Sequence, residues 1–390
     1  MKTQQIRLKE INSVFPPGDY YFSGAEAMVE GAIAAGCNYY GGYPITPATE
    51  VMERMSVRLP GIGGVFMQME DEIASISSVV GASWAGAKAM TATSGPGFSL
   101  MQETIGYAAM TETPIVIADI QRQGPSTGGI GEGAGDIMQA RWGSHGNYQM
   151  IAIYPWSVQE MYDQTITAFN YAERYRTPVI ILGEAVLAHQ REKLCITEKV
   201  KVFERIKKPG APPFCFEEVD GGFPLPSFGE KGRILVSGTT HEESGIRKPA
   251  DSATYEALTA KLHNKIMDKK EEIVDYETYH LEEDVDVAVV AYGFTARSSL
   301  FAVEEMRQEG KKVGMLRLKT MWPFADKAVE YTGAKAKKIL VPEMNKGQIV
   351  GEVMKYASCD VVSYTQTNRE IIYPDVIINK LKELINGYRF

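Results

Sequence analysis

The chain has 390 residues, 44% of them hydrophobic, and a formal net charge of −8, so it can bury a large core and exceeds the usual size of one domain. The negative charge and a pI of about 5.4 argue against a nucleic-acid partner or an anionic membrane surface, because both need clustered Lys and Arg. No apolar run has the length of a membrane span, and residues 1–22 lack the apolar core of a signal peptide. We therefore expect a metabolic protein of the cytoplasm.

Metal-ligating spacings are absent from the sequence. The four cysteines lie far apart, so no two form the CxxC spacing of zinc and iron–sulfur sites. The five histidines are also scattered, and none forms an HxxxH pair. We expect no metal ligands in this chain.

Residues 1–22 are polar, and we expect them to form an extended arm on the surface. From 23 to 202, helical segments alternate with short apolar strands, which predicts a doubly wound α/β domain around a parallel sheet. Strands are expected at 38–40, 87–93, 113–121, 150–154 and 178–183, and helices at 24–37, 50–58, 98–110 and 157–175, with one more that begins at Glu72.

The helix that begins at Glu72 is rich in Ala, Ser and Gly, and a strand leads from it to the turn Ser94-Gly95-Pro96-Gly97. With so little side-chain bulk, a helix can press its backbone against a neighbour or a ligand, and Gly-rich corners often hold cofactors. A carboxylate in a first helical turn is also stabilised by the helix dipole while solvated. The pattern by itself therefore leaves Glu72 as either a site residue or an ordinary surface residue.

Two loops of this domain are candidates for ligand binding. In GGYPITPATE, at 41–50, two prolines fix the backbone and hold Thr46 on a stiff loop, although an ordinary strand-to-helix turn has the same composition. The Gly-rich segment 122–136 follows a buried strand and is typical of a binding loop or a lid. Within it, GIGEGA at 129–134 matches the dinucleotide fingerprint only loosely, because its glycines lie midway in the loop and do not open a helix.

The character of the chain changes at 203–284, where prolines cluster before a charged helix at 255–272. We interpret this segment as a connector with little core, packed over the first domain. At Val285 the alternation resumes, and residues 285–390 are expected to form a second, smaller α/β domain. Its expected elements are strands at 285–293, 313–324 and 338–342 and helices at 296–309 and from 348.

Several segments together resemble one family. YPITPATE, MQMEDEIAS, TATSGPGFSLMQE, TETPIVI, ARWGSHG and AERYRTPVIIL are similar to the α subunits of 2-oxoacid:ferredoxin oxidoreductases, above all those of the 2-oxoglutarate enzymes. The resemblance resumes at THEESG, RLKTMWPF and EMNKGQ in the same order. It implies a pyrimidine-binding domain for thiamine diphosphate at 23–202 and a transketolase C-terminal-like domain at 285–390.

The resemblance also implies site residues. The family's activating glutamate matches Glu72, which precedes Gly81 by the family's nine positions; a buried carboxyl with a raised pKa suits a hydrogen bond to the aminopyrimidine. The substrate-side threonine matches Thr46, and the carboxylate-binding arginine matches Arg122, with Arg141 as a second candidate, because arginine pairs bidentately with a carboxylate. The remaining residues implied to contact the cofactor are Tyr43, Pro44, Ile45, Ser94 and Gly95.

The sequence lacks the GDG motif with which thiamine enzymes hold the diphosphate and its Mg²⁺. The resemblance therefore implies a partner β subunit that supplies this half of the thiamine diphosphate site, its Mg²⁺ and an iron–sulfur cluster, in an α2β2 or larger assembly. Ferredoxin is the expected electron acceptor and coenzyme A the co-substrate, and γ and ferredoxin-like subunits are possible additions. The motif EMNKGQ, at 343–348, could serve packing or a coenzyme A contact.

The implied reaction is the oxidative decarboxylation of 2-oxoglutarate to succinyl-CoA and CO2, or the reverse carboxylation. One alternative is the same chemistry on branched-chain 2-oxoacids or pyruvate, which lack the distal carboxylate. Another is a non-catalytic scaffold subunit of such a complex. A scaffold would need neither Glu72 nor Thr46 nor the turn at 94–97, and their joint presence favours an enzyme.

Overall fold

The computed structural model describes residues 8–230 and 233–387. Its largest sheet has seven strands in the order β14-β7-β8-β6-β5-β3-β4, and all neighbours in it are parallel except β14 and β7. Its strands are β3 (Tyr39–Gly42), β4 (Val65–Gln68), β5 (Ala89–Thr93), β6 (Ile115–Gln121), β7 (Ile151–Ile153), β8 (Pro178–Glu184) and β14 (Thr320–Trp322).

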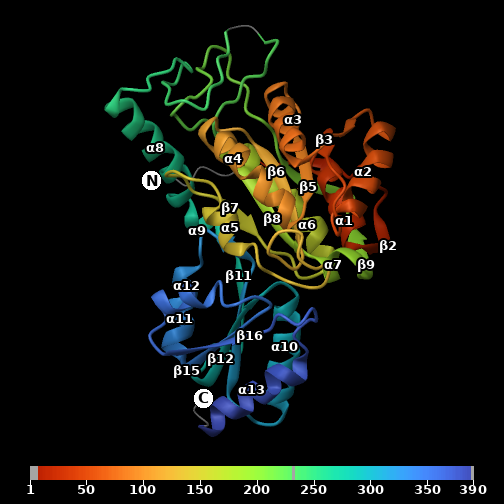
Figure 1. Ribbon diagram of the computed structural model, residues 1–390, viewed down its shortest axis with the longest axis vertical. Helices are drawn as coiled ribbons and strands as arrows, with labels where there is room; N and C mark the ends of the chain where they lie inside the picture. Colours follow the sequence, from red (N-terminus) through yellow and green to blue (C-terminus); the bar gives the residue numbers. More distant parts are fainter. Residues whose placement is uncertain (1–7, 231–232, 388–390) are drawn as a thin grey trace.

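Helices cover both faces of this sheet (Figure 1). Along β6, Ile115 and Ile117 join one core and Val116 and Ala118 the other, because successive strand side chains point to opposite faces. On the first face lie α3 (Glu72–Trp84), α4 (Gly95–Met110) and α5 (Ile137–Trp142); on the second lie α1 (Gly24–Ala34), α2 (Thr49–Gly61) and α6 (Val158–Tyr175). The doubly wound architecture expected from the sequence is confirmed.

The described part of the N-terminal arm is extended and paired. The strands β1 (Leu8–Asn12) and β2 (Gly18–Ser23) pair antiparallel with β10 (Lys199–Phe203) and β9 (Arg191–Ile196), and the short helix α7 (Ala185–His189) precedes β9. Residues 1–7 of the expected arm lie outside the described residues. The arm is therefore held by two ribbons formed with the end of the first domain.

The proline-rich segment after β10 has little regular structure until α8 (Ser252–Met267) and α9 (Lys270–Ile273). It is fastened to the first domain by a buried ion cluster, in which Nζ of Lys261 and Nζ of Lys265 lie 2.5 and 3.1 Å from the Glu112 carboxylate. Glu112 is fully buried. The end of this segment thus packs against the first domain.

The second sheet has five strands in the order β11-β13-β12-β15-β16, parallel except for β11. Its strands are β11 (Tyr276–Tyr279), β12 (Val285–Tyr292), β13 (Val313–Leu318), β15 (Ala336–Glu343) and β16 (Asp360–Thr365). Around it α10 (Gly293–Gln308) packs with α13 (Pro374–Asn386), and α11 (Asp326–Lys335) packs with α12 (Val350–Tyr356) (Figure 1). The edge strand β11 lies within 203–284, so this sheet begins before the boundary placed at 285.

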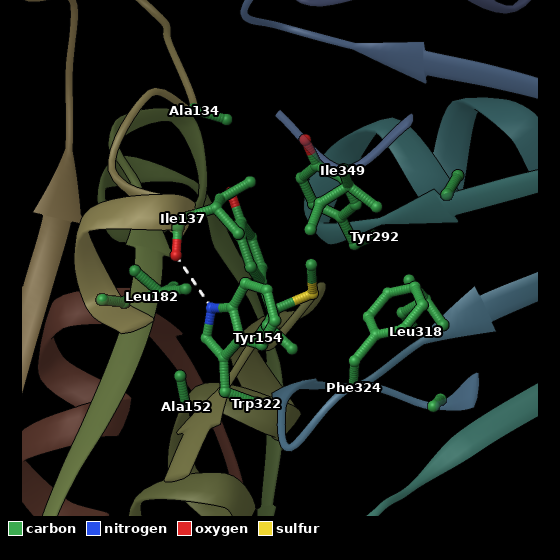
Figure 2. Close-up of a cluster of buried hydrophobic side chains, with 14 of the residues drawn as sticks. Ala134, Ile137, Ala152, Tyr154, Leu182, Tyr292, Leu318, Trp322, Phe324 and Ile349 are labelled. Atoms are coloured by element: carbon green, nitrogen blue, oxygen red, sulfur yellow. Dashed lines mark hydrogen bonds between the residues drawn. The ribbon is translucent and has the colours of Figure 1, made fainter. Parts of the chain in front are cut away.

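The prediction of a single strand at 313–324 is wrong. This segment forms two strands, β13 and β14, and β14 joins the first sheet. Trp322 of β14 donates through Nε1 to the carbonyl oxygen of Ile137, 2.8 Å away (Figure 2). The ring of Tyr154, which directly follows β7, and the ring of Tyr292 at the end of β12 lie 5.1 Å apart between centroids. The two sheets thus share one continuous buried core, to which residues of both contribute.

Candidate active site

Four neighbouring strands of the first sheet end at the same edge, and each leads into a segment singled out from the sequence. The strand β3 leads into the loop at 43–47, β4 into Glu72, β5 into the turn at 94–97 and β6 into the Gly-rich loop at 122–136. Ligands bind outside the carboxyl ends of the strands in open α/β sheets. The topology therefore gathers the predicted site residues of these segments at one edge.

Glu72 is a buried carboxylic acid at the start of α3. The helix is capped by Asp71, whose Oδ1 accepts from the amide of Ala74 at 2.7 Å, and only 6% of Glu72 is exposed. Burial raises the pKa of Glu72 above its usual range, with a smaller contribution from the Asp71 charge, while a hydrogen bond to its own backbone amide opposes the rise. This acid holds a proton more strongly than a solvated glutamate does.

The room for the Glu72 side chain exists because residue 97 is glycine. A Cβ atom built on Gly97 would lie 2.5 Å from Cγ of Glu72, and closer still to Oε1 of Glu72 and Oγ1 of Thr93. A similar close approach occurs at Gly41 of β3, where a Cβ would lie 3.2 Å from the carbonyl oxygen of Ser75 in α3. The small residues of this region thus let α3 and the turn at 94–97 pack closely around the carboxyl group.

Arg122 and Thr46 come together although 76 positions separate them. The Arg122 guanidinium is buried and donates from Nη1 to the carbonyl oxygen of Thr46 at 2.7 Å and from Nη2 to that of Thr127 at 3.1 Å. Its Nε has no hydrogen-bond partner within the described part of the chain. The guanidinium is thus anchored on two sides and retains an unused donor.

Arg141, the second candidate, lies in α5 with its guanidinium stacked over the Trp142 ring at 3.9 Å from the centroid. Burial lowers its pKa. It does not line the pocket beside Arg122. Of the two arginines, the geometry favours Arg122 as the residue next to Thr46, and a substrate contact for either stays a prediction.

A pocket with a volume of about 710 Å³ opens beside Arg122. Its walls come from the turn at 94–97, the Gly-rich loop and the second domain's 343–348 segment, and they include Gly95, Arg122, Asp136, Asn345 and Lys346. Tyr43, Pro44, Ile45 and Glu72 are not among its lining residues, although they lie at the same edge of the sheet.

The sequence analysis missed two carboxyl groups at this pocket: Asp136, which lines it, and Asp119, which packs against Asp136. Asp119 of β6 is fully buried against Asp136 of the Gly-rich loop, and burial followed by the Asp136 charge raises the pKa of Asp119 well above its usual range. The pKa of Asp136 is raised to about 6, again mainly by burial. No donor from the described chain reaches either Asp119 oxygen, so this carboxyl favours its protonated form. The available signal was an aspartate inside the apolar strand IVIADIQ.

Across residues 8–230 and 233–387, no group of three or more His, Cys, Asp or Glu has the proximity needed to hold a metal ion. No helix in the same ranges is long and apolar enough to cross a membrane.

Comparison with known proteins defines the class of this chain. Residues 30–261 match the family model described as pyruvate flavodoxin/ferredoxin oxidoreductase, thiamine diphosphate-binding, and residues 285–374 match pyruvate:ferredoxin oxidoreductase core domain II. The chain belongs to the pyruvate flavodoxin/ferredoxin oxidoreductase family. A split-gene transketolase with a TM-score of 0.53 and 13% identity shares the fold alone.

Within this family the chain is similar to 2-oxoglutarate enzymes. It is 46% identical over 370 residues to the 2-oxoglutarate synthase subunit KorA of Methanothermobacter marburgensis, covering 93% of this chain and 98% of that one. It is 36% identical to the ketoisovalerate oxidoreductase subunit VorB of the same organism, over 93% of this chain and 96% of the relative. A solved 2-oxoglutarate:ferredoxin oxidoreductase from Magnetococcus marinus, with 2-oxoglutarate, coenzyme A and succinyl-CoA bound, has a TM-score of 0.88 and 33% identity, over 95% of this chain and 66% of that chain.

Proposed function

We propose that this chain is the α subunit of a thiamine-diphosphate-dependent 2-oxoglutarate:ferredoxin oxidoreductase, which converts 2-oxoglutarate and coenzyme A to succinyl-CoA and CO2 or runs the reverse reaction. The observation that carries the proposal is the Glu72 carboxyl, buried at the carboxyl edge of the sheet in space left by Gly97. A scaffold subunit would have no use for a buried acid in a glycine-lined recess. The 46% identity to a 2-oxoglutarate synthase subunit supports the choice of reaction.

The residues present fit the pyrimidine half of thiamine diphosphate. Glu72, with its raised pKa, can hold a proton in a hydrogen bond to the aminopyrimidine ring, and the turn at Ser94 and Gly95 and the loop residues Tyr43 to Ile45 are close in the sheet topology. When bound, the cofactor supplies the nucleophilic carbon and electron sink that decarboxylation of a 2-oxoacid requires. The chain's own residues orient the ring and exclude water from it.

On the substrate side, Arg122 places a buried guanidinium group next to the Thr46 backbone. A guanidinium pairs with the carboxylate of a 2-oxoacid through two parallel hydrogen bonds. The unused Nε of Arg122 is available for such a bond after a small rearrangement of the guanidinium. Arg122 therefore binds and orients the substrate carboxylate in this proposal, with Thr46 beside it.

The activity requires a partner. Because the sequence has no GDG motif, the diphosphate and Mg²⁺ belong to a β subunit, which also carries an iron–sulfur cluster and passes electrons to ferredoxin. The relatives' names describe subunits, which supports a hetero-oligomer, and the proposed assembly is α2β2 or larger. The cytoplasmic location expected from the sequence also stays a prediction.

The substrate is tested with the chain co-purified with its partner. The complex should reduce a viologen dye with 2-oxoglutarate and coenzyme A at a kcat/KM at least tenfold above that with 2-oxoisovalerate or pyruvate. A preference for 2-oxoisovalerate would favour the alternative represented by the ketoisovalerate relative. Absence of dye reduction with all three acids, in a complex that binds thiamine diphosphate, would contradict the proposal.

A further inference from the structure

The motif EMNKGQ, whose role the sequence leaves open, forms a tight turn directly after β15. Its first residue, Glu343, is fully buried and accepts hydrogen bonds at Oε1 from the Tyr292 hydroxyl and from the amide of Ile349, both at 2.8 Å. It also accepts from the amide of Val350 at 3.2 Å, at the start of α12. Glu343 thus fixes the turn within the second domain.

Asn345 faces the other way, towards the first domain. Its Nδ2 donates to the carbonyl oxygen of Ala134 in the Gly-rich loop at 2.7 Å and to the Tyr292 hydroxyl at 3.0 Å. Its Oδ1 accepts from the amides of Gly347 and Gln348 at 2.8 and 3.0 Å. Only 5% of Asn345 is exposed, so one buried amide both shapes its own turn and holds the facing loop.

Three further contacts join the same turn to this loop and to the start of α5. Oε1 of Gln348 accepts from the amide of Met138 at 3.1 Å, and its Nε2 donates to the carbonyl oxygen of Gly135. The backbone amide of Ala134 donates to the carbonyl oxygen of Met344 at 3.1 Å. The second domain therefore holds the end of the Gly-rich loop at Ala134 and Gly135 and the start of α5 at Met138.

That half of the loop lies directly against Arg122. A Cβ atom on Gly133 would lie 3.2 Å from the carbonyl carbon of Arg122. The backbone at the end of the loop therefore packs directly on the backbone at its start, with no side chain between them. The amide of Gln123 donates to the carbonyl oxygen of Gly131 at 3.2 Å. A continuous set of contacts thus runs from Asn345 through the loop to the backbone of Arg122, whose guanidinium donates to the Thr46 carbonyl oxygen.

From these contacts we propose that Asn345, assisted by Gln348, is a positioning residue of the active site: it holds the Gly-rich loop so that Arg122 stays aligned for the 2-oxoacid carboxylate. The second domain in this way sets substrate affinity through the position of the loop. The role of Arg122 rests on the proposed function, whereas the hold on the loop does not. Loosening the loop lowers the fraction of binding-competent protein and raises the apparent dissociation constant by the same factor.

The hold is tested by hydrogen exchange in the purified complex. Asn345→Asp keeps the size and the accepting oxygen but places a carboxylate oxygen against the Ala134 carbonyl. Peptides covering 122–136 should exchange roughly tenfold faster or more, since a buried carbonyl loses its donor. The matched control is Asn170→Asp, because Asn170 also bridges backbone groups, donating to the Lys201 carbonyl at 2.9 Å and accepting from the Phe203 amide at 2.7 Å. The control should leave exchange at 122–136 unchanged.

Dye-reduction kinetics on the same samples give the second readout. For Asn345→Asp the KM for 2-oxoglutarate should rise about tenfold, while kcat changes less than threefold and the KM for coenzyme A stays the same. If Asn345→Asp does not assemble, Gln348→Glu makes the corresponding change at a half-buried position and should loosen the same peptides.

The possible results separate the two proposals. Unchanged exchange at 122–136 in both Asn345→Asp and Gln348→Glu would overturn the positioning role. Faster exchange with an unchanged KM would also overturn it, because the loop would then not set Arg122. The variants could also show faster exchange while the unmodified complex has no activity on any 2-oxoacid. That result would support the contact between Asn345 and the loop and would refute only the proposed function.

Discussion

Gly97→Ala should lower kcat although it replaces no functional side chain. An added Cβ would lie 2.5 Å from Cγ of Glu72, whereas ordinary contact begins at 3.4 Å, so the Glu72 side chain must move by about 0.9 Å, the difference between the two. Overpacking of this kind costs about 1–3 kcal/mol, and a misplacement of roughly 1 Å in a catalytic group can cost about 100-fold in rate. We therefore expect kcat to fall about 100-fold.

The assay is dye reduction by the assembled complex, with thermal unfolding measured alongside. The control is Gly351→Ala in α12, where an added Cβ meets nothing within 4 Å; it should stabilise the helix by about 0.5–1 kcal/mol and leave kcat unchanged. Because alanine also favours the helical backbone of α4, a loss of activity at Gly97 must come from the crowding. A Gly97→Ala complex that keeps more than a third of normal kcat would refute the claim that activity depends on the position of the Glu72 carboxyl beside Gly97.

Two other perturbations address stability. Asp119→Asn should stabilise the protein increasingly as pH rises above about 4. Burial raises the folded-state pKa values of Asp119 and Asp136, so the unmodified protein loses stability as pH climbs from the usual aspartate pKa towards these raised values. The shift at Asp136, from 3.8 to about 6, by itself corresponds to roughly 3 kcal/mol. Denaturant unfolding at several pH values checks this, and equal pH dependence of both proteins would contradict it. Glu112→Gln should destabilise by about 3–5 kcal/mol, since two buried lysines lose their partner, and expose α8 to proteolysis. Glu204→Gln, whose ion pair with Lys9 is exposed, is the control and should change stability by less than about 1 kcal/mol.

Much of the first domain could be predicted because its strands are fully buried apolar runs, such as the one at 113–121, and because its helices alternate with them. The strand β4 was missed since it has only four residues, most of them exposed at the edge of the sheet. The helix α5 was missed because its six residues follow a long glycine-rich loop. Short elements carry too little periodicity to be recognised from one sequence.

The break at Lys319 could not be predicted, because the apolar residues before and after it form one continuous pattern. Only the presence of a free edge beside β7 directs Thr320–Trp322 into the other sheet. The candidate residues Glu72, Thr46 and Arg122 were identified from the sequence, but the contact of Arg122 with the Thr46 backbone depends on tertiary packing. Asn345 and Ala134 lie 211 positions apart, and no local pattern indicates such a pair.

The substitution Glu72→Gln tests the central claim most directly. It keeps the shape of the side chain and its hydrogen-bonding capacity but removes the titratable proton. In the assembled complex, with binding of thiamine diphosphate and the unfolding temperature measured as controls, kcat for 2-oxoglutarate-dependent dye reduction should fall by about 10²–10⁴-fold, as expected for loss of an acid–base group. A complex of normal stability and cofactor content that retains kcat within threefold would contradict the account.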